Sequence, residues 1–138
     1  MSAIGAIQSG SIGIQGHFAN AFAALYIACG QDPACVAESV GITRMELNQQ
    51  GNLYLSVTLP SIMTGTVGGG TSLPTQRACL DILGMAGPGH AQALAEVCGA
   101  LALAGEISLT SAICSNHFAR AHQQLARGRQ SGEQAENG

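Results

Sequence analysis

Two side chains of this 138-residue chain have the chemistry and the surroundings for proton transfer. Asp32 ends the sequence I-A-C-G-Q-D at residues 27–32 and stands directly before a proline. His122 lies in a helix-like sequence near the C-terminus. Carboxyl and imidazole groups are the usual general acids and bases at cellular pH. Both residues are therefore candidates for acid–base chemistry.

A glycine-rich turn, G-T-V-G-G-G-T at residues 65–71, is the third candidate. Consecutive glycines cost backbone entropy, and they occur where the main chain takes positive φ or approaches another group closely. The run lacks the G-x-G-x-x-G spacing and the Gly-Lys-Ser/Thr ending of phosphate-binding loops. It predicts only a ligand that passes close to the backbone, with a plain connecting loop as the alternative.

The residue types alone leave other interpretations open. Asp32 could cap a following helix, because proline suits the first helical position. A histidine on a helix, such as His122, is usually a surface residue or a satisfied one. Asn20 carries donors and an acceptor on an apolar helix, so it should have a partner. That partner could be a substrate, or the asparagine could be a structural amide in the core.

The elements that would position these residues form an α+β pattern. Residues 17–29 read as a helix that is apolar nearly all round, which is normally buried on every side. Residues 42–47 and 53–59 alternate in polarity around the turn-forming residues 48–52, which predicts an antiparallel β-hairpin. Helices are expected at 74–83, 91–104 and 107–125, the last two separated by Gly105. We expect helices packed around a β-hairpin over residues 1–126, and a disordered polar tail over residues 127–138.

Composition narrows the functions further. Only 9% of the residues are charged, 46% are hydrophobic, and the net charge is −3. All basic residues are arginines, and they form no stripe that could bind nucleic acid. Such a surface would adhere to other protein, so we expect it to lie against the rest of a longer chain, a sister subunit, or both.

The sequence also predicts the compartment. No signal peptide is visible, and the apolar stretches at 18–29 and 91–104 are too short to cross a bilayer. The five cysteines form no C-x-x-C pair, which favours reduced structural thiols over a metal site. We expect a cytoplasmic protein with no membrane association and no bound metal.

Taken together, three stretches resemble the C-terminal part of 3-hydroxy-3-methylglutaryl-CoA reductases. They are I-A-C-G-Q-D at 27–32, the glycine turn, and H-F-A-R-A-H at 117–122. The resemblance extends from about residue 10 to about residue 125, and it is closer to the class I enzymes, of the soluble bacterial type, than to class II. It implies a fragment of the large substrate-binding domain.

The resemblance also implies roles for individual residues. Asp32 falls on the catalytic aspartate, which works in a hydrogen-bonded cluster with a lysine and a glutamate. His122 falls on the general acid that protonates the departing CoA thiolate, and Asn20 on a contact to substrate or to the catalytic lysine. The cofactor-binding turn would lie beside the nicotinamide end of NADPH and comprises Gly65, Thr66, Val67, Gly68, Gly69 and Gly70. The chain departs from the family pattern at Asn116, where a small residue is usual, and at Gln15, Gly16 and Phe18.

The implied reaction is reduction of 3-hydroxy-3-methylglutaryl-CoA to mevalonate with two NADPH, in a homodimer or a multiple of dimers. The chain contains no lysine. The family's catalytic glutamate and its D-A-M-G-x-N block would precede residue 1. We therefore expect the isolated chain to be inactive. The alternative is a non-catalytic descendant of the same domain that only binds a ligand or oligomerises.

Overall fold

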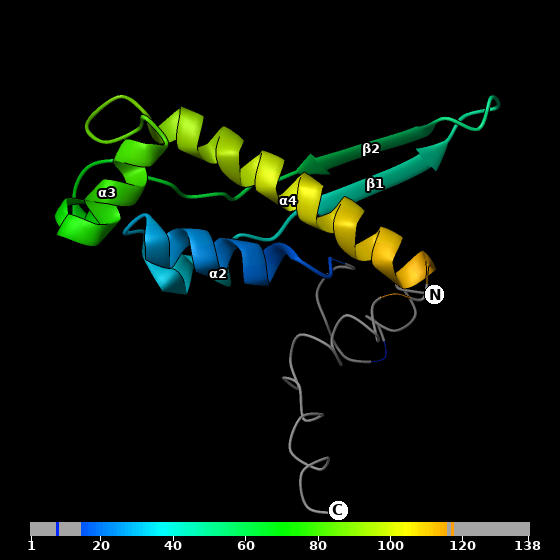
Figure 1. Ribbon diagram of the computed structural model, residues 1–138, viewed down its shortest axis with the longest axis horizontal. Coiled ribbons are helices and arrows are strands. Elements are labelled where there is room, and N and C mark those ends of the chain that lie inside the picture. The colour runs from blue at the N-terminus through cyan, green and yellow to red at the C-terminus, as the bar shows by residue number, and fades with distance from the viewer. Residues whose placement is uncertain (1–7, 9–14, 116, 118–138) are drawn as a thin grey trace, which may run out of the picture. The chain divides into compact units, whose positions relative to one another are not determined.

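A computed structural model describes Gln8, residues 15–115 and His117, and its secondary structure is shown in Figure 1. The chain divides into two compact units, Met1–Glu106 and Ile107–Gly138. Helices and a two-stranded antiparallel sheet make up the described part, so the predicted α+β class is confirmed. The elements are α2 (Phe18–Ala28), the 3-10 helix η1 (Pro33–Val36), β1 (Ile42–Leu47), β2 (Leu53–Thr58), the 3-10 helix η2 (Gly69–Ser72), α3 (Pro74–Ile82) and α4 (Ala91–Cys114).

The core of the first unit consists of two clusters that share helices α2 and α4. One cluster joins aromatic residues of α2, Phe18, Phe22 and Tyr26, to Cys98 and Ala102 of α4. The other joins Cys29, just after α2, to one leucine from α3 and one from α4. These contacts follow the helical spacing of apolar side chains, so α2 and α4 contribute most of the buried core of the unit.

The expectation that helix α2 is buried on every side is wrong for the described chain. Phe22 and Tyr26 are fully buried, whereas Asn20 is exposed and Ile27 keeps 59% of its surface exposed. Described elements, namely α3, α4, η1 and the end of β2, cover only part of the surface of α2. The apolar outer face of α2 is exposed within the described part of the chain.

The hairpin has the predicted strands and turn. Strand β1 pairs with β2 in a register that sets Met45 opposite Leu55 and Leu47 opposite Leu53. The side chain of Asn48 accepts hydrogen bonds from the backbone N–H groups of residues 50 and 52, which closes the turn. The apolar residues therefore share one face, as the alternation indicates. Much of that face is exposed, and the exposed side chains include Met45, Leu47 and Leu53.

Helix α4 corrects the prediction of two helices separated at Gly105. It is continuous over Ala91–Cys114. Gly105 lies against the imidazole of His17, and a Cβ at this position would overlap the ring. The glycine thus serves close packing rather than a helix break. Residues 118–125 of the predicted last helix, and the predicted tail, lie outside the described residues.

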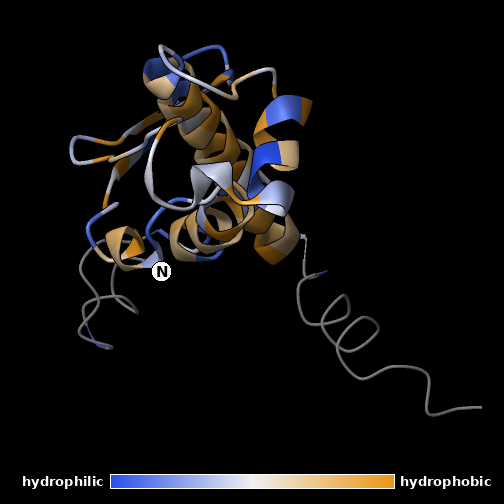
Figure 2. Ribbon diagram, turned by 90° about the vertical axis from the view of Figure 1, so that its left-hand side faces the viewer, coloured by the Kyte–Doolittle hydropathy of each residue, from blue (hydrophilic) through white to orange (hydrophobic). Residues whose placement is uncertain are grey.

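The continuous helix also overturns the length argument against a membrane span. Its 24 residues are long and apolar enough to cross a bilayer by length and composition alone. The core helix of a water-soluble protein passes the same test, so the length and composition of α4 are weak evidence for a membrane span. Figure 2 shows that hydrophobic residues run along most of this helix.

One acidic side chain in α4, Glu106, has a structural role that we did not predict. It is buried, with 4% of its surface exposed, and its Oε1 accepts a hydrogen bond of 2.8 Å from the backbone N–H of His17. His17 is the N-cap residue of α2 and provides no cap of its own. The carboxylate therefore satisfies a free donor at the positive end of that helix dipole.

All five cysteines are free thiols, as predicted, and they differ in burial. Cys29 and Cys98 are buried and Cys114 is exposed. Burial raises the pKa of the Cys98 thiol to about 11 and also raises the pKa of Cys29. We expect iodoacetamide at pH 8 to alkylate Cys114 well before Cys29 and Cys98, because only the thiolate reacts. Peptide mass spectrometry of the native protein measures this order, and denatured protein, in which the order should vanish, is the control.

Candidate active site

The structure brings two of the three motif stretches together through their backbones. Gly30, which follows α2, has a positive φ of 67°. A Cβ at Gly30 would lie 2.5 Å from the carbonyl carbon of Gly70, and one at Gly70 would lie 3.2 Å from the carbonyl oxygen of Gly30. Gly30 is therefore required where the two stretches of the chain cross, and a side chain at Gly70 would fit tightly there. At Gly70 the group that approaches closely is another part of the backbone, and binding of a ligand at the turn stays a prediction.

The side-chain amide of Gln31 holds the two stretches at this crossing. Its Nε2 donates to the carbonyl oxygen of Gly65 at 2.8 Å, and its Oε1 accepts from the N–H of Gly65 at 2.8 Å. The same Nε2 also donates to the carbonyl oxygen of Cys29 at 2.9 Å. Our sequence analysis gave Gln31 no role. An amide side chain between a glycine and an aspartate gives no local signal of a partner 34 residues away.

The turn itself presents bare main chain. Gly68 has φ 78° and ψ −178°, a conformation that is nearly restricted to glycine. Val67, Gly68 and Gly69 are exposed, and their N–H groups have no hydrogen-bond acceptor within the part of the chain that the structure describes. A Cβ at Gly68 would meet nothing. These features fit a ligand, such as a dinucleotide, that approaches the backbone closely.

Two threonines fix the ends of the turn from inside. Thr66 is buried, and its hydroxyl donates to the carbonyl oxygen of Gly87 at 2.6 Å. Thr71 is also buried, and its hydroxyl donates to the carbonyl oxygen of Gly68 at 2.6 Å. The exposed tip of the turn is therefore held by partly buried hydrogen bonds on both sides, which limits the number of conformations it can adopt.

Asp32 lies two residues beyond the glycine crossing, at the start of η1. Its Oδ1 accepts a hydrogen bond of 2.9 Å from the N–H of Ala34, and Pro33 occupies the first helical position. The capping interpretation is thus confirmed. The carboxylate is exposed, and Asp32 follows closely after Gly30, which contacts the turn at Gly70, so capping does not prevent it from meeting a reactant. A catalytic role for Asp32 stays a prediction.

The remaining predicted site residues are not brought to this crossing by the described structure. Asn20 is exposed on α2, so the alternative of a structural amide in the core is wrong for the described chain. His122 and Asn116 lie outside the described residues. Their roles also stay predictions.

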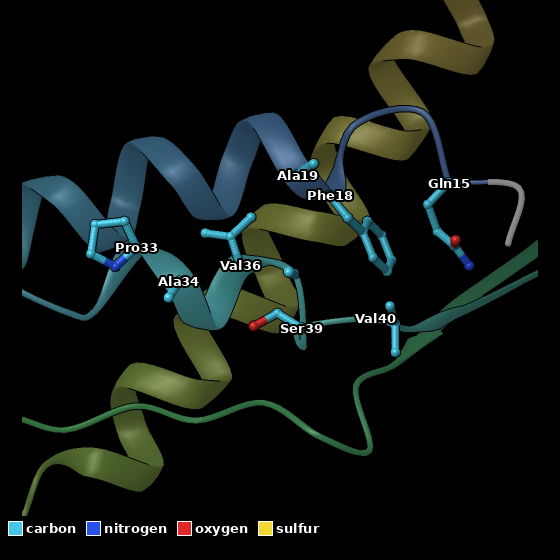
Figure 3. A pocket seen from close by; sticks show the side chains of 9 residues that line it. Gln15, Phe18, Ala19, Pro33, Ala34, Val36, Ser39 and Val40 are labelled. Carbon is cyan, nitrogen blue, oxygen red and sulfur yellow. The ribbon is translucent and has the colours of Figure 1, made fainter. Parts of the chain in front are cut away.

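A groove of about 500 Å³ opens elsewhere on the first unit, between the start of α2 and η1 (Figure 3). Phe18, Val36 and Val40 line it with apolar groups, and Gln15 at its edge donates a hydrogen bond to the carbonyl oxygen of Gly41. None of the lining residues is charged. The groove therefore offers shape and apolar surface, and it lacks a group for acid–base chemistry.

Comparisons with known proteins place the chain among reductases. Residues 1–127 match the family model described as hydroxymethylglutaryl-coenzyme A reductase. A protein named 3-hydroxy-3-methylglutaryl-coenzyme A reductase from Pyrococcus abyssi is 48% identical over 130 residues, which cover 90% of this chain and 32% of the relative. Proteins of the same name from Aeropyrum pernix and Fusarium fujikuroi are 50% and 48% identical over 131 residues. The alignments cover 91% and 90% of this chain, and 31% and 13% of those relatives, respectively.

The alignments cover only part of each relative. The chain spans about a third of the length of the archaeal relatives, and a smaller share of the fungal one. The similarity therefore concerns one part of those proteins.

Proposed function

The chain belongs to the hydroxymethylglutaryl-coenzyme A reductase family, and from this premise we propose that it forms part of a cytoplasmic enzyme that reduces 3-hydroxy-3-methylglutaryl-CoA to mevalonate with NADPH. One observation supports this proposal most directly. The crossing of Gly30 and Gly70 holds the Asp32 stretch against a turn with exposed main chain. Reduction of a thioester needs proton transfer beside the hydride donor, and the link between the stretch that ends in Asp32 and the turn supports such an arrangement.

The chain's own residues would act around this crossing. The exposed turn at residues 65–70 binds the nicotinamide end of NADPH, which supplies the hydride when bound. The carboxylate of Asp32 tunes the proton affinity of the catalytic glutamate and helps to hold the ammonium group of the catalytic lysine. Asn20 contacts the substrate, and His122 protonates the thiolate of CoA as it leaves. A lysine is missing from this chain, so the cation that stabilises the oxyanion comes from the rest of the reductase, as does the catalytic glutamate.

We also propose that the working enzyme is a dimer or a multiple of dimers, which binds no nucleic acid and is not anchored in a membrane through this chain. The support for a dimer is the exposed apolar surface of the described residues, because isolated domains seldom leave so many large hydrophobic side chains in water. These side chains include Ile27, Ile42, Leu47, Leu53, Leu73 and Ile82.

The direct test is NADPH oxidation with 3-hydroxy-3-methylglutaryl-CoA as substrate, followed at 340 nm. We expect the whole reductase, expressed from the gene that includes this segment, to turn over, and the purified 138-residue chain to show no activity. Without the lysine the isolated chain lacks a contribution often worth about 3 kcal/mol to the transition state.

Two results would contradict the proposal. Turnover by the isolated chain, with host reductase excluded, would mean that its own residues suffice. A gene whose reading frame is limited to this segment, with a product that binds a ligand or oligomerises without reducing substrate, would favour a non-catalytic descendant of the domain.

A further inference from the structure

The amide of Gln31 makes a reciprocal pair of hydrogen bonds with a single residue, Gly65, 34 positions along the chain. Such a pair fixes direction as well as distance, because one donor and one acceptor must both be met. The third bond, from the same nitrogen to the carbonyl oxygen of Cys29 at 2.9 Å, ties the amide to the end of α2. One side chain thus connects the end of α2, the Asp32 stretch and the start of the glycine turn.

Other contacts of these stretches do not duplicate this link. At the crossing of Gly30 and Gly70, the absence of side chains lets the two backbones come into van der Waals contact. This contact includes no directional bond. The threonine hydroxyls bond to carbonyl oxygens of the turn itself and of the loop at Gly87. The carboxylate of Asp32 bonds to its own 3-10 helix. Gln31 is therefore the side chain, within the described residues, that hydrogen-bonds the Asp32 stretch to the turn.

We infer that Gln31 is a positioning residue that sets the placement of the glycine turn relative to Asp32, and through it the binding of the nicotinamide end of the cofactor. This inference rests on the proposed function. It assigns Gln31 no contact with reactants. Its consequence is that the two hydrogen-bonding functions of the amide, one donor and one acceptor, should be needed at the same time.

The substitution Gln31→Glu tests that consequence, because its effect depends on protonation. The ionised carboxyl group can accept from the N–H of Gly65, but it faces the carbonyl oxygens of Gly65 and Cys29 without a donor. The protonated carboxyl group has both a donor and an acceptor and can restore the reciprocal pair. In the whole reductase we expect the KM for NADPH to rise about tenfold relative to wild type at pH 8, the effect of losing one hydrogen bond. The ratio should begin to fall below about pH 6 and approach one near pH 4, because a glutamate carboxyl group ordinarily protonates at about pH 4.3.

The matched control is Gln76→Glu on helix α3. The Nε2 of Gln76 donates one long hydrogen bond of 3.3 Å to the carbonyl oxygen of Ile27, and its Oε1 accepts one of 2.6 Å from the hydroxyl of the adjacent Thr75. Both bonds are exposed, and they go to two different residues. Gln76→Glu makes the same chemical change as Gln31→Glu, but at a residue that has no reciprocal pair of hydrogen bonds with one partner. The ratio of its KM for NADPH to that of the wild type should therefore stay near one at every pH. The variant Gln31→Met keeps the length of the side chain and removes both hydrogen-bonding functions. It should raise the KM at every pH, with no recovery in acid.

Hydrogen exchange measured by mass spectrometry gives a readout that does not depend on activity. Peptides that cover residues 61–70 should exchange faster than wild type in Gln31→Met at all pH values, and in Gln31→Glu only at the higher pH. A KM ratio for Gln31→Glu that is flat with pH and equal to that of Gln76→Glu, with unchanged exchange, would overturn the inference. Failure of the proposed function looks different: the wild-type enzyme would not oxidise NADPH, while the exchange experiment would still report on the hydrogen bonds. If Gln31→Glu does not fold, the comparison of Gln31→Met with the wild type decides.

Discussion

Asp32→Asn should reduce thioester reduction by the whole enzyme on the order of a hundredfold while leaving its stability nearly unchanged. The carboxylate of Asp32 accepts one hydrogen bond, from the N–H of Ala34, and caps η1. Asparagine is as good an N-cap as aspartate, so the amide oxygen can keep that bond. What the substitution removes is the negative charge, which in the proposed site tunes the proton affinity of the neighbouring catalytic groups.

The measurement is kcat with 3-hydroxy-3-methylglutaryl-CoA, together with the midpoint of thermal unfolding. Asp81→Asn on α3 is the matched control. Asp81 is an exposed aspartate whose ion pair with Arg77, 3.4 Å long, should contribute little. If Asp32→Asn and Asp81→Asn were equally active, Asp32 would be a helix cap and nothing more. A large loss of stability in Asp32→Asn would mean that its activity cannot be compared.

Local patterns were sufficient to predict most of the fold. The strands of the hairpin, helices α2 and α3 and the cap at Asp32 follow from alternation, helical spacing and the aspartate–proline pair. Each of these signals depends on residues within about ten positions of one another. The failure at Gly105 has the same origin. A glycine within a helix suggests a break, and only its packing against His17, 88 positions earlier, explains why the helix continues.

Several residues of the candidate site could also be found from local sequence, whereas the contacts between them could not. The glycine turn and Asp32 could be found from their residue types and from the family resemblance. That they lie together, and that Gln31 hydrogen-bonds one to the other, depends on the folding of α2 against α3 and of η2 against α3, because these contacts bring the end of α2 to the turn. Glu106 is a similar case. A single carboxylate in an apolar helix gives no sign that its partner is the N-terminus of another helix.

His122→Gln in the whole reductase should lower the rate of thioester reduction on the order of a hundredfold, the usual contribution of a general acid. Glutamine has a similar volume and can donate a hydrogen bond, but it cannot release a proton near neutral pH. The proposed task of His122 is to protonate the thiolate of CoA as it leaves. Reduction of free mevaldehyde releases no thiolate, so the variant should keep most of its activity with that substrate.

The comparison of two substrates in one variant separates chemistry from folding. A variant with a disturbed structure, or with weakened NADPH binding, loses activity with both substrates, whereas loss of the acid affects only the thioester. His117→Gln is the matched control, because it changes the other histidine of H-F-A-R-A-H, for which we expect packing or hydrogen bonding rather than catalysis. Equal losses of His122→Gln on both substrates would place His122 in binding or folding. A larger thioester-specific loss in His117→Gln than in His122→Gln would assign the acid to the first histidine.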